Sequence, residues 1–321
     1  MMEETIRNFA EQLKYAPEIE NVTALKRGGK FIIAGMGGSN LASDLLKAWN
    51  PELDIVIHRD FGLPAMAENE LQSRLVIISS YSGGTEETID AFREALKKKL
   101  SVIVLATGGE LLELAKENGA PYIQIPGIGI RPQLAIALSL KAMLKAMDED
   151  GALEKISELA GSFNAADNET AGKNLAEKLA GKIPVIYSSS RNLPLARYWK
   201  INFEETGKTP AFCNAFPELN HNEMVGFASE AAGESLQSKF NFVFIKDKND
   251  DPRIQKRAEA TAKLYEAKGF GVESADLEGN IWQKIFGSLS LSNWTSFYLA
   301  RNRGVDPEDI AVLENFKKSV K

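Results

Sequence analysis

The stretch "RLVIISSYSGGTEETIDAFREALKKK" (residues 74–99) decides the fold. Its first part, "RLVII", is continuously apolar, which is typical of a strand buried on both faces of a parallel sheet. The hydroxyl- and glycine-rich loop "SSYSGGT" (79–85) follows. Thr85 then stands in the N-cap position of a helix whose apolar residues Ile89, Phe92 and Leu96 share one face. The stretch therefore predicts a strand–loop–helix unit of an α/β protein.

Similar units occur along the whole chain. Further strands are predicted at residues 30–35, 53–59, 101–109 and 121–127, and a second series at 183–190, from 241 and at 270–279. The two series resemble each other and are joined by a polar helical stretch, which indicates an internal duplication. We expect an α/β fold of two similar doubly wound subdomains with parallel sheets. The N-terminal subdomain, residues 1–150, would carry phosphate-binding loops, and residues 151–321 would form the C-terminal subdomain with a helical tail.

Composition narrows the class of function. The formal net charge of the 321 residues is −6, which argues against a nucleic-acid partner or a membrane surface. No apolar run is long enough for a membrane span, and the acidic, helix-like start is unlike a signal peptide. The single cysteine, Cys213, excludes an intramolecular disulfide and favours a cytoplasmic location. One cysteine and two histidines leave little material for a metal site, so we expect no cofactor and activity in the presence of a chelator.

Two loops have the composition of a phosphate site. "GMGGS" (35–39) and "SSYSGGT" (79–85) each follow a predicted strand of the first series and precede a helix. Helix N-termini at the carboxyl ends of parallel strands attract anions, and glycine lets the backbone approach a ligand. Each loop alone is equally typical of an ordinary capped turn. The corresponding loop of the second series, "KDKNDDPR" (246–253), has no such character, so only the first copy is expected to bind phosphate.

One feature of these loops weakens the phosphate interpretation, and a second suggests a dinucleotide as an alternative ligand. Glu86 and Glu87 follow Thr85 directly and would repel a phosphate unless both side chains turn away. "GMGGS" also matches the first two glycines of a dinucleotide-binding loop, with Asp60 as a ribose-binding acid. Asn40 replaces the third glycine, however, and that interpretation leaves "SSYSGGT" unexplained.

Beyond these loops, the chain resembles a known family. "GMGGS" followed by "SSYSGGTEET" resembles a sugar isomerase (SIS) domain, which binds the phosphate of phosphosugars. The segments "KTPAFCNAFPELNHNEMVGF" (208–227) and "WTSFYLARNRGVDP" (294–307) resemble the tandem SIS proteins that are bifunctional phosphoglucose/phosphomannose isomerases. "FPELNHNE" is the most specific part. The resemblance implies aldose–ketose isomerisation of a sugar phosphate through a cis-enediol, by a homodimer.

Aldose–ketose isomerisation needs a base that moves a proton between neighbouring carbons, and an acid–base group that opens the sugar ring. The resemblance places the base at Glu205, with Glu204 as the competing assignment. It places the ring-opening group at His221, contributed across the dimer interface. His58, on an apolar strand, is expected to be structural. Thr295 matches a threonine linked to the phosphomannose activity, and Lys317 matches loosely a lysine that contacts substrate.

The same resemblance assigns the phosphate grip to Gly38, Ser39, Ser80, Ser82 and Thr85. It also implies a cation that stabilises the enediolate, normally the arginine of a Gln-Pro-Arg sequence. Here the order is reversed to Arg131-Pro132-Gln133, so position-by-position transfer gives Gln133. We favour Arg131, because the developing negative charge favours a guanidinium.

Two other functions compete with this one. The isomerase half of an amidotransferase would need a glutaminase domain with an N-terminal cysteine, and the chain begins "MMEET". A non-catalytic phosphosugar regulator would usually carry a basic DNA-binding segment, and neither end of the chain has that character. Ammonia release from glutamine would support the first alternative, and a sugar-phosphate-dependent gel shift would support the second.

Overall fold

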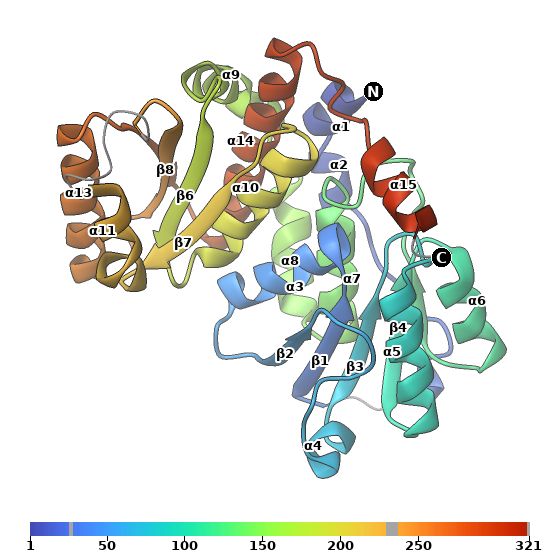
Figure 1. The fold of residues 1–321 in the computed structure, drawn as a ribbon. Coiled ribbons are helices and arrows are strands. Elements are labelled where there is room, and N and C mark those ends of the chain that lie inside the picture. Colours follow the sequence, from blue (N-terminus) through green and yellow to red (C-terminus); the bar gives the residue numbers. More distant parts are fainter. Residues whose placement is uncertain (26–27, 229–236, 320–321) are drawn as a thin grey trace. The chain divides into compact units, whose positions relative to one another are not determined.

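The computed structural model describes residues 1–25, 28–228 and 237–319 (Figure 1). The chain forms two compact units. The N-terminal unit consists of Asn8–Asn164, and the C-terminal unit consists of Ala165–Lys321 together with Met1–Arg7. Each unit contains one parallel sheet with helices, so the predicted α/β class with two parallel sheets is confirmed.

The N-terminal unit has a five-stranded parallel sheet in the order β2-β1-β3-β4-β5. Its strands are β1 (Lys30–Gly35), β2 (Asp54–His58), β3 (Leu75–Ser79), β4 (Ser101–Ala106) and β5 (Tyr122–Gln124). Its helices are α2 (Ala10–Leu13), η1 (Val22–Ala24), α3 (Gly37–Trp49), α4 (Glu68–Gln72), α5 (Glu86–Lys97), α6 (Gly109–Glu117), α7 (Ile136–Ala146) and α8 (Asp150–Leu159).

The C-terminal unit has a four-stranded parallel sheet in the order β7-β6-β8-β9. Its strands are β6 (Ile183–Ser189), β7 (Phe212–Phe216), β8 (Phe240–Asp247) and β9 (Gly271–Leu277). Its helices are α1 (Met2–Arg7), η2 (Ala165–Asn168), α9 (Glu169–Lys178), α10 (Leu193–Glu205), η3 (Glu218–His221), α11 (Glu223–Ala228), α13 (Pro252–Ala267), α14 (Ile281–Asn302) and α15 (Ala311–Ser319). In both units the second strand is at an edge beside the first, as a duplication requires.

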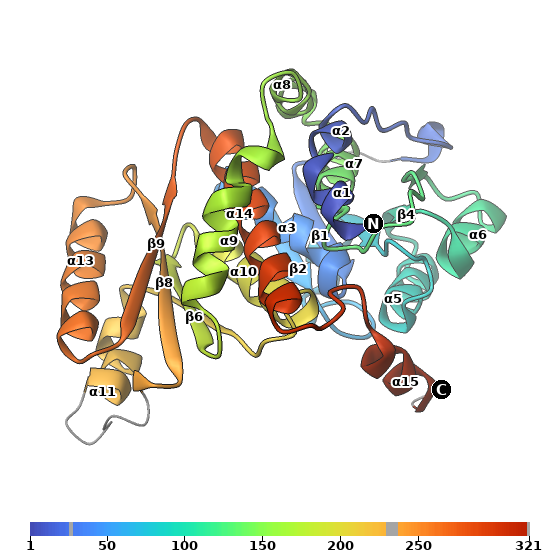
Figure 2. The same ribbon diagram turned by 90° about the horizontal axis from the view of Figure 1, so that it is seen from above.

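Helices cover both faces of each sheet. In the N-terminal unit α3 and α7 pack on one face and α5 and α6 on the other. In the C-terminal unit α13 covers one face, while α10 and α14 lie on the opposite face (Figure 2). The core under α13 is rich in aromatic side chains, where the ring of Phe242 contacts those of Tyr187, Tyr265 and Phe270.

Three details differ from the sequence-based boundaries. The N-terminal unit continues to Asn164, because α8 packs on α7 and α2. Helix α1 belongs to the C-terminal unit, where Arg7 forms an ion pair with Glu169 at 2.7 Å. The sequence pattern does not predict strand β7, since "FCNAF" is short and its first three residues are exposed or half-buried. No helix in the described ranges is long and apolar enough to cross a membrane.

Candidate active site

Gly38 joins the "GMGGS" loop to the segment that holds Arg131. A Cβ atom on Gly38 would lie 2.7 Å from the backbone nitrogen of Gln133 and 3.0 Å from Cβ of Pro132. Because these neighbours are backbone and a rigid ring, only glycine allows this approach. The start of α3 and the segment before α7 are therefore packed directly against each other in the N-terminal unit.

The "SSYSGGT" loop is tied to the same helix start. The hydroxyl of Ser39 accepts a hydrogen bond from the backbone N–H of Tyr81 at 2.9 Å, and the hydroxyl of Ser79 donates to the carbonyl of Ser39 at 3.1 Å. These bonds connect the carboxyl end of β3 with the N-terminus of α3. Gly38, Ser39 and the loop after β3 thus lie at one edge of the sheet, as predicted for converging loops.

The hydroxyls of that loop face different surroundings. Ser80 is 1% exposed, and its hydroxyl donates to Oγ1 of Thr85 at 2.9 Å and accepts from the N–H of Gly83 at 3.2 Å. Ser82 is exposed, and its hydroxyl accepts from the N–H of Gly84 at 3.3 Å. Thr85 is the N-cap residue of α5 as expected, but its side chain makes no capping hydrogen bond. Ser80 holds the loop in shape, while Ser82 and Thr85 are accessible to a ligand.

The two glycines of the loop serve different purposes. Gly83 has a φ of +69°, and a Cβ there would lie 1.7 Å from the carbonyl oxygen of Gly108 in the loop after β4. This close contact requires a glycine at position 83. Gly84 has open space beside it, which suits the approach of a ligand. Glu86 is exposed and Glu87 is half-buried at the first turn of α5.

Of the two candidate stabilisers, Arg131 is half-buried and Gln133 is 2% exposed. The carbonyl of Arg131 accepts backbone hydrogen bonds from Leu134 and Ala135, which fixes this residue in the turn that precedes α7. A half-exposed guanidinium can reach a ligand more readily than a buried amide. The exposure of the two side chains therefore favours Arg131.

Asn40, which replaces the third glycine of the dinucleotide-binding motif, has a structural role. Its buried amide donates to the carbonyl of Gly35 at 2.6 Å and to that of His58 at 3.2 Å, so it joins the ends of β1 and β2. His58 in turn contacts the carbonyl of Phe61 through Nε2 at 3.2 Å, which agrees with a structural role. Asp60 is exposed and accepts a hydrogen bond from the N–H of Phe61.

In the C-terminal unit, the two candidate bases differ in their partners. The carboxylate of Glu204 forms an ion pair with Lys200 at 2.7 Å, one turn earlier on α10. Burial raises the pKa of the Tyr198 phenol, and the nearby charge of Glu205, the last residue of α10, raises it further. The Tyr198 hydroxyl donates to Asn293 of α14 at 2.7 Å. Glu205 thus lies near Tyr198, which contacts α14, whereas the carboxylate of Glu204 is paired with the half-buried Lys200.

Helix α14 carries Thr295 alongside this contact. Trp199 donates to the hydroxyl of Ser288 at 2.9 Å, and Asn202 donates to that of Ser292 at 3.2 Å, so the two helices run in the same direction. Glu205 and Thr295 each follow the Asn202–Ser292 bond by three residues, so both lie about one turn further along their helices. Thr295 is fully buried, and its hydroxyl donates to the carbonyl of Leu291 at 2.8 Å.

His221 lies at the opposite end of the sheet from Glu205. Helix α10 returns antiparallel to the strands and ends at Glu205, and β7 then carries the chain back to η3 (Figure 1). The five residues of β7 alone span about 16 Å. The His221 side chain is exposed and makes no hydrogen bond to any residue that the structure describes. Glu205 and His221 of one chain are therefore too far apart to act on neighbouring atoms of one sugar.

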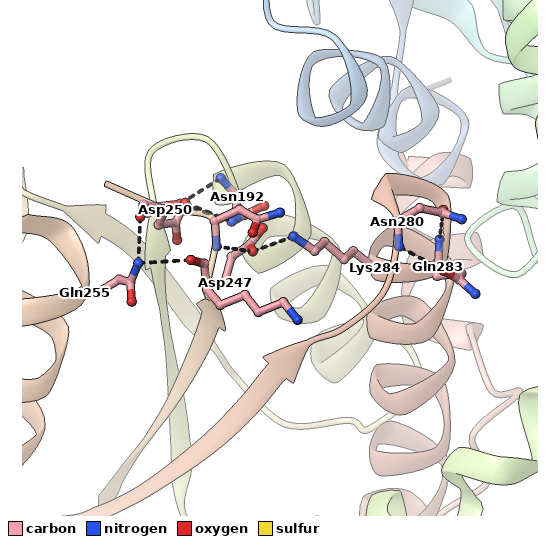
Figure 3. A network of polar contacts seen from close by, with 10 residues as sticks. Asn192, Asp247, Asp250, Gln255, Asn280, Gln283 and Lys284 are labelled. Atoms are coloured by element: carbon pink, nitrogen blue, oxygen red, sulfur yellow. Dashed lines mark hydrogen bonds and ion pairs between the residues drawn. The ribbon is translucent and has the colours of Figure 1, made fainter. Parts of the chain in front are cut away.

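The carboxyl edge of the second sheet holds carboxylates where the first holds hydroxyls. Asp250 accepts hydrogen bonds from Ser189 at 2.8 Å and from Asn192, the N-cap residue of α10, at 3.4 Å (Figure 3). Asp247 forms a buried ion pair with Lys284 at 2.6 Å. Burial, with a contribution from Asp247, raises the pKa of Asp250. A carboxylate therefore lies at this helix start.

Lys317 is an exposed residue of the last turn of α15. The described residues contain no group of three or more His, Cys, Asp or Glu side chains placed to hold a metal ion.

Comparison with known proteins identifies the family. Residues 168–320 match the model of the bacterial phosphoglucose isomerase C-terminal SIS domain. The bifunctional phosphoglucose/phosphomannose isomerase of Caldicellulosiruptor bescii is 31% identical, over 99% of this chain and 98% of its own length. The protein of the same name from Thermoplasma acidophilum is 32% identical over 100% of both chains.

The fold has solved relatives as well. The crystal structure of tagatose-6-phosphate ketose/aldose isomerase from Escherichia coli superposes with a TM-score of 0.66 at 14% identity, covering 96% of this chain and 94% of that one. The fold match, the matched domain and the full-length relatives agree. The chain belongs to the family of bifunctional phosphoglucose/phosphomannose isomerases, which are enzymes of the SIS fold.

Proposed function

We propose that the chain interconverts fructose 6-phosphate with glucose 6-phosphate and with mannose 6-phosphate, as a homodimer in the cytoplasm. The observation that carries the proposal is the packing of Gly38 against Pro132 and Gln133. Together with the hydrogen bonds of Ser39 to Tyr81 and Ser79, it brings both loops and the Arg131 segment to one edge of the N-terminal sheet, a suitable grip for a sugar phosphate. In this proposal Gly38, Ser39, Ser80, Ser82 and Thr85 form or support the grip, and Lys317 contacts the substrate.

The chemistry is assigned to the C-terminal unit and Arg131. Glu205 removes the proton from C2 of the open-chain aldose, and the electron pair forms the C1–C2 double bond while negative charge develops on O1. Arg131 stabilises that charge. The proton of the C2 hydroxyl passes to O1, and the carboxyl group of Glu205 then protonates C1 while an electron pair of O2 forms the C2 carbonyl, which gives the ketose. Mannose 6-phosphate forms when the enediol rotates about C2–C3 and is protonated at C2 from its opposite face. Thr295 is the residue we assign to this second outcome.

His221 is assigned to opening the ring of a substrate bound by the partner chain. Its exposure, and its separation from Glu205 by the length of β7, support a role outside its own chain. In a homodimer in which each chain contributes its His221 to the substrate bound by the other chain, each substrate would have one Glu205 and one His221.

Activity of matched variants tests the proposal. Conversion of fructose 6-phosphate should be coupled to glucose-6-phosphate oxidation for wild type, Glu205→Gln and Glu204→Gln. We expect Glu205→Gln to lose about 10³-fold in kcat, which is the usual scale for a general base, and Glu204→Gln to stay within a few-fold of wild type. Full activity of Glu205→Gln would refute the assignment of the base. A wild-type protein inactive on both aldose phosphates would refute the function.

A further inference from the structure

The carboxylate of Glu223, two residues after His221, is held by two neighbouring strands. Its Oε1 accepts a hydrogen bond from the Tyr187 hydroxyl at 2.7 Å, and its Oε2 accepts one from Nδ2 of Asn214. Tyr187 of β6 and Asn214 of β7 are direct partners in the register of the parallel sheet. One carboxylate therefore joins the first residue of α11 to two adjacent strands.

Both donors are fixed in place. Tyr187 is fully buried, with its ring 5.3 Å from that of Phe242 and 5.9 Å from that of Phe216. Burial raises the pKa of Tyr187, so its hydroxyl remains a donor throughout the physiological range. Oδ1 of Asn214 accepts from the backbone N–H of Ala215 at 2.8 Å, which orients the amide so that Nδ2 faces Glu223.

The residues before His221 are anchored as firmly. Leu219 is fully buried in the aromatic core beneath α13. The amide of Asn220 donates to the hydroxyl of Thr261 on α13 at 2.8 Å. On the other side, Asn222 donates to Glu218 at 2.7 Å and accepts from the N–H of Glu223 at 2.6 Å. His221 is thus an exposed residue of a short segment that Leu219, Asn220 and Glu223 fasten to the rest of the unit.

Glu223 differs from the other anchors because it ties the segment to the sheet by a charge-assisted pair of bonds. The buried side chain of Leu219 keeps the segment attached to the core but does not prevent the turn from rotating. The two directed hydrogen bonds to the Glu223 carboxylate fix the orientation of the turn. The exposed imidazole would gain from this, since an acid–base group must lie within hydrogen-bond reach of its proton.

We propose that Glu223, with Tyr187 and Asn214, positions the His221 imidazole for ring opening of the substrate. Glu223 is a positioning residue and does not touch the sugar. The proposal rests on the role proposed above for His221.

The variants follow from the donors and acceptors. Glu223→Gln keeps the shape of the side chain but replaces one acceptor oxygen with an NH₂ group. Either the Tyr187 hydroxyl or Nδ2 of Asn214 then faces this NH₂ group and loses its acceptor. Asn214→Asp in that background restores complementarity, because the new carboxylate accepts from the NH₂ group introduced at position 223, while the amide oxygen at that position still accepts from Tyr187. Glu259→Gln on α13, an exposed residue outside this set, is the matched control.

Two substrates separate ring opening from proton transfer. Fructose 6-phosphate is mainly a closed ring, whereas erythrose 4-phosphate has no free hydroxyl for a five-membered ring and needs only the proton transfer. We expect Glu223→Gln to lose about tenfold in kcat on fructose 6-phosphate and less than twofold on erythrose 4-phosphate. His221→Ala should show the same pattern with a larger loss, and Glu205→Gln should lose both activities. The double variant should regain most of the hexose activity.

A spectroscopic measurement keeps this proposal separate from the proposed function. The chain has two histidines, so ¹³C-labelled histidine gives two imidazole signals, and His58→Gln assigns them. We expect the His221 signal to narrow in Glu223→Gln, as the ring becomes more mobile, and to be restored in the double variant. An unchanged signal, or equal losses on both substrates, would overturn the positioning role. Inactivity of wild type would refute the function and leave the spectroscopic result standing.

Discussion

Helices α9 and α14 approach so closely at Gly172 that a single methyl group should separate them. A Cβ atom at Gly172 would lie 2.4 Å from Cβ of Trp294 and 3.0 Å from the backbone nitrogen of Thr295. Carbon atoms in contact normally stay about 3.5–4.0 Å apart. Both neighbouring atoms are in or next to the α14 backbone, and the Trp294 indole donates to the carbonyl of Ala165 at 2.8 Å. The contact therefore yields only if the helices move apart.

The magnitude follows from two opposing terms. Gly172→Ala gains about 1 kcal/mol of helix propensity and loses about 3 kcal/mol to overpacking, at the upper end of its usual range because the neighbours are rigid. The net free energy of unfolding should fall by about 2 kcal/mol. Gly287→Ala in the middle of α14 is the matched control, since a Cβ there meets nothing within 4 Å. That variant should gain about 0.5–1 kcal/mol.

Urea unfolding followed by tryptophan fluorescence measures both changes. Three of the four tryptophans, Trp199, Trp282 and Trp294, are in the C-terminal unit. With an m-value of about 2 kcal/mol per molar, the midpoint should fall by about 1 M in Gly172→Ala and rise slightly in Gly287→Ala. Equal or greater stability of Gly172→Ala would show that the α9–α14 contact is not as tight as described.

Three further outcomes are expected. Ser82→Ala should raise KM about tenfold, the scale of one hydrogen bond to a charged group, without loss of stability, whereas Ser80→Ala should also lower the urea midpoint because its hydroxyl holds the loop. Thr295→Val should lower the yield of mannose 6-phosphate relative to glucose 6-phosphate, measured by product analysis, and an unchanged ratio would remove Thr295 from the mechanism. Burial lowers the pKa of Lys141 to about 8, so the unfolded chain binds more protons between pH 8 and 10.5. The stability of wild type relative to Lys141→Met should therefore rise by about 2 kcal/mol from pH 7 to pH 10 in urea titrations, and parallel pH profiles would contradict this.

The sequence is sufficient to predict the sheet-forming runs and the duplication. Apolar runs such as "KFIIAG" and "IPVIYSS" form β1 and β6, which hold the same place in their sheets. Continuous apolar strands are distinctive because both faces of a parallel sheet are buried. Strand β7 cannot be predicted in this way, because an edge strand with Asn214 in its middle lacks that pattern.

The details of the candidate site depend on contacts between distant residues. The loop composition predicts that Gly83 admits a ligand, yet its closest neighbour is Gly108, and no local pattern reveals such a contact. The resemblance groups Ser80 with Ser82, although the fold turns one hydroxyl inward and leaves the other exposed. The hydrogen bond from Tyr187 to Glu223 joins residues 36 positions apart, so it cannot be predicted from the local sequence.

Deuterium incorporation during the reaction tests whether Glu205 carries the proton between C1 and C2. Fructose 6-phosphate should be incubated in D₂O with wild type and with Glu205→Gln, and the products analysed by NMR at C2. A carboxylate that carries the proton between C1 and C2 exchanges part of it with solvent. We expect wild type to form both glucose 6-phosphate and mannose 6-phosphate with deuterium at C2, and Glu205→Gln to form neither at a comparable rate. Products of wild type with only protium at C2, or labelled products from Glu205→Gln at the wild-type rate, would contradict this expectation.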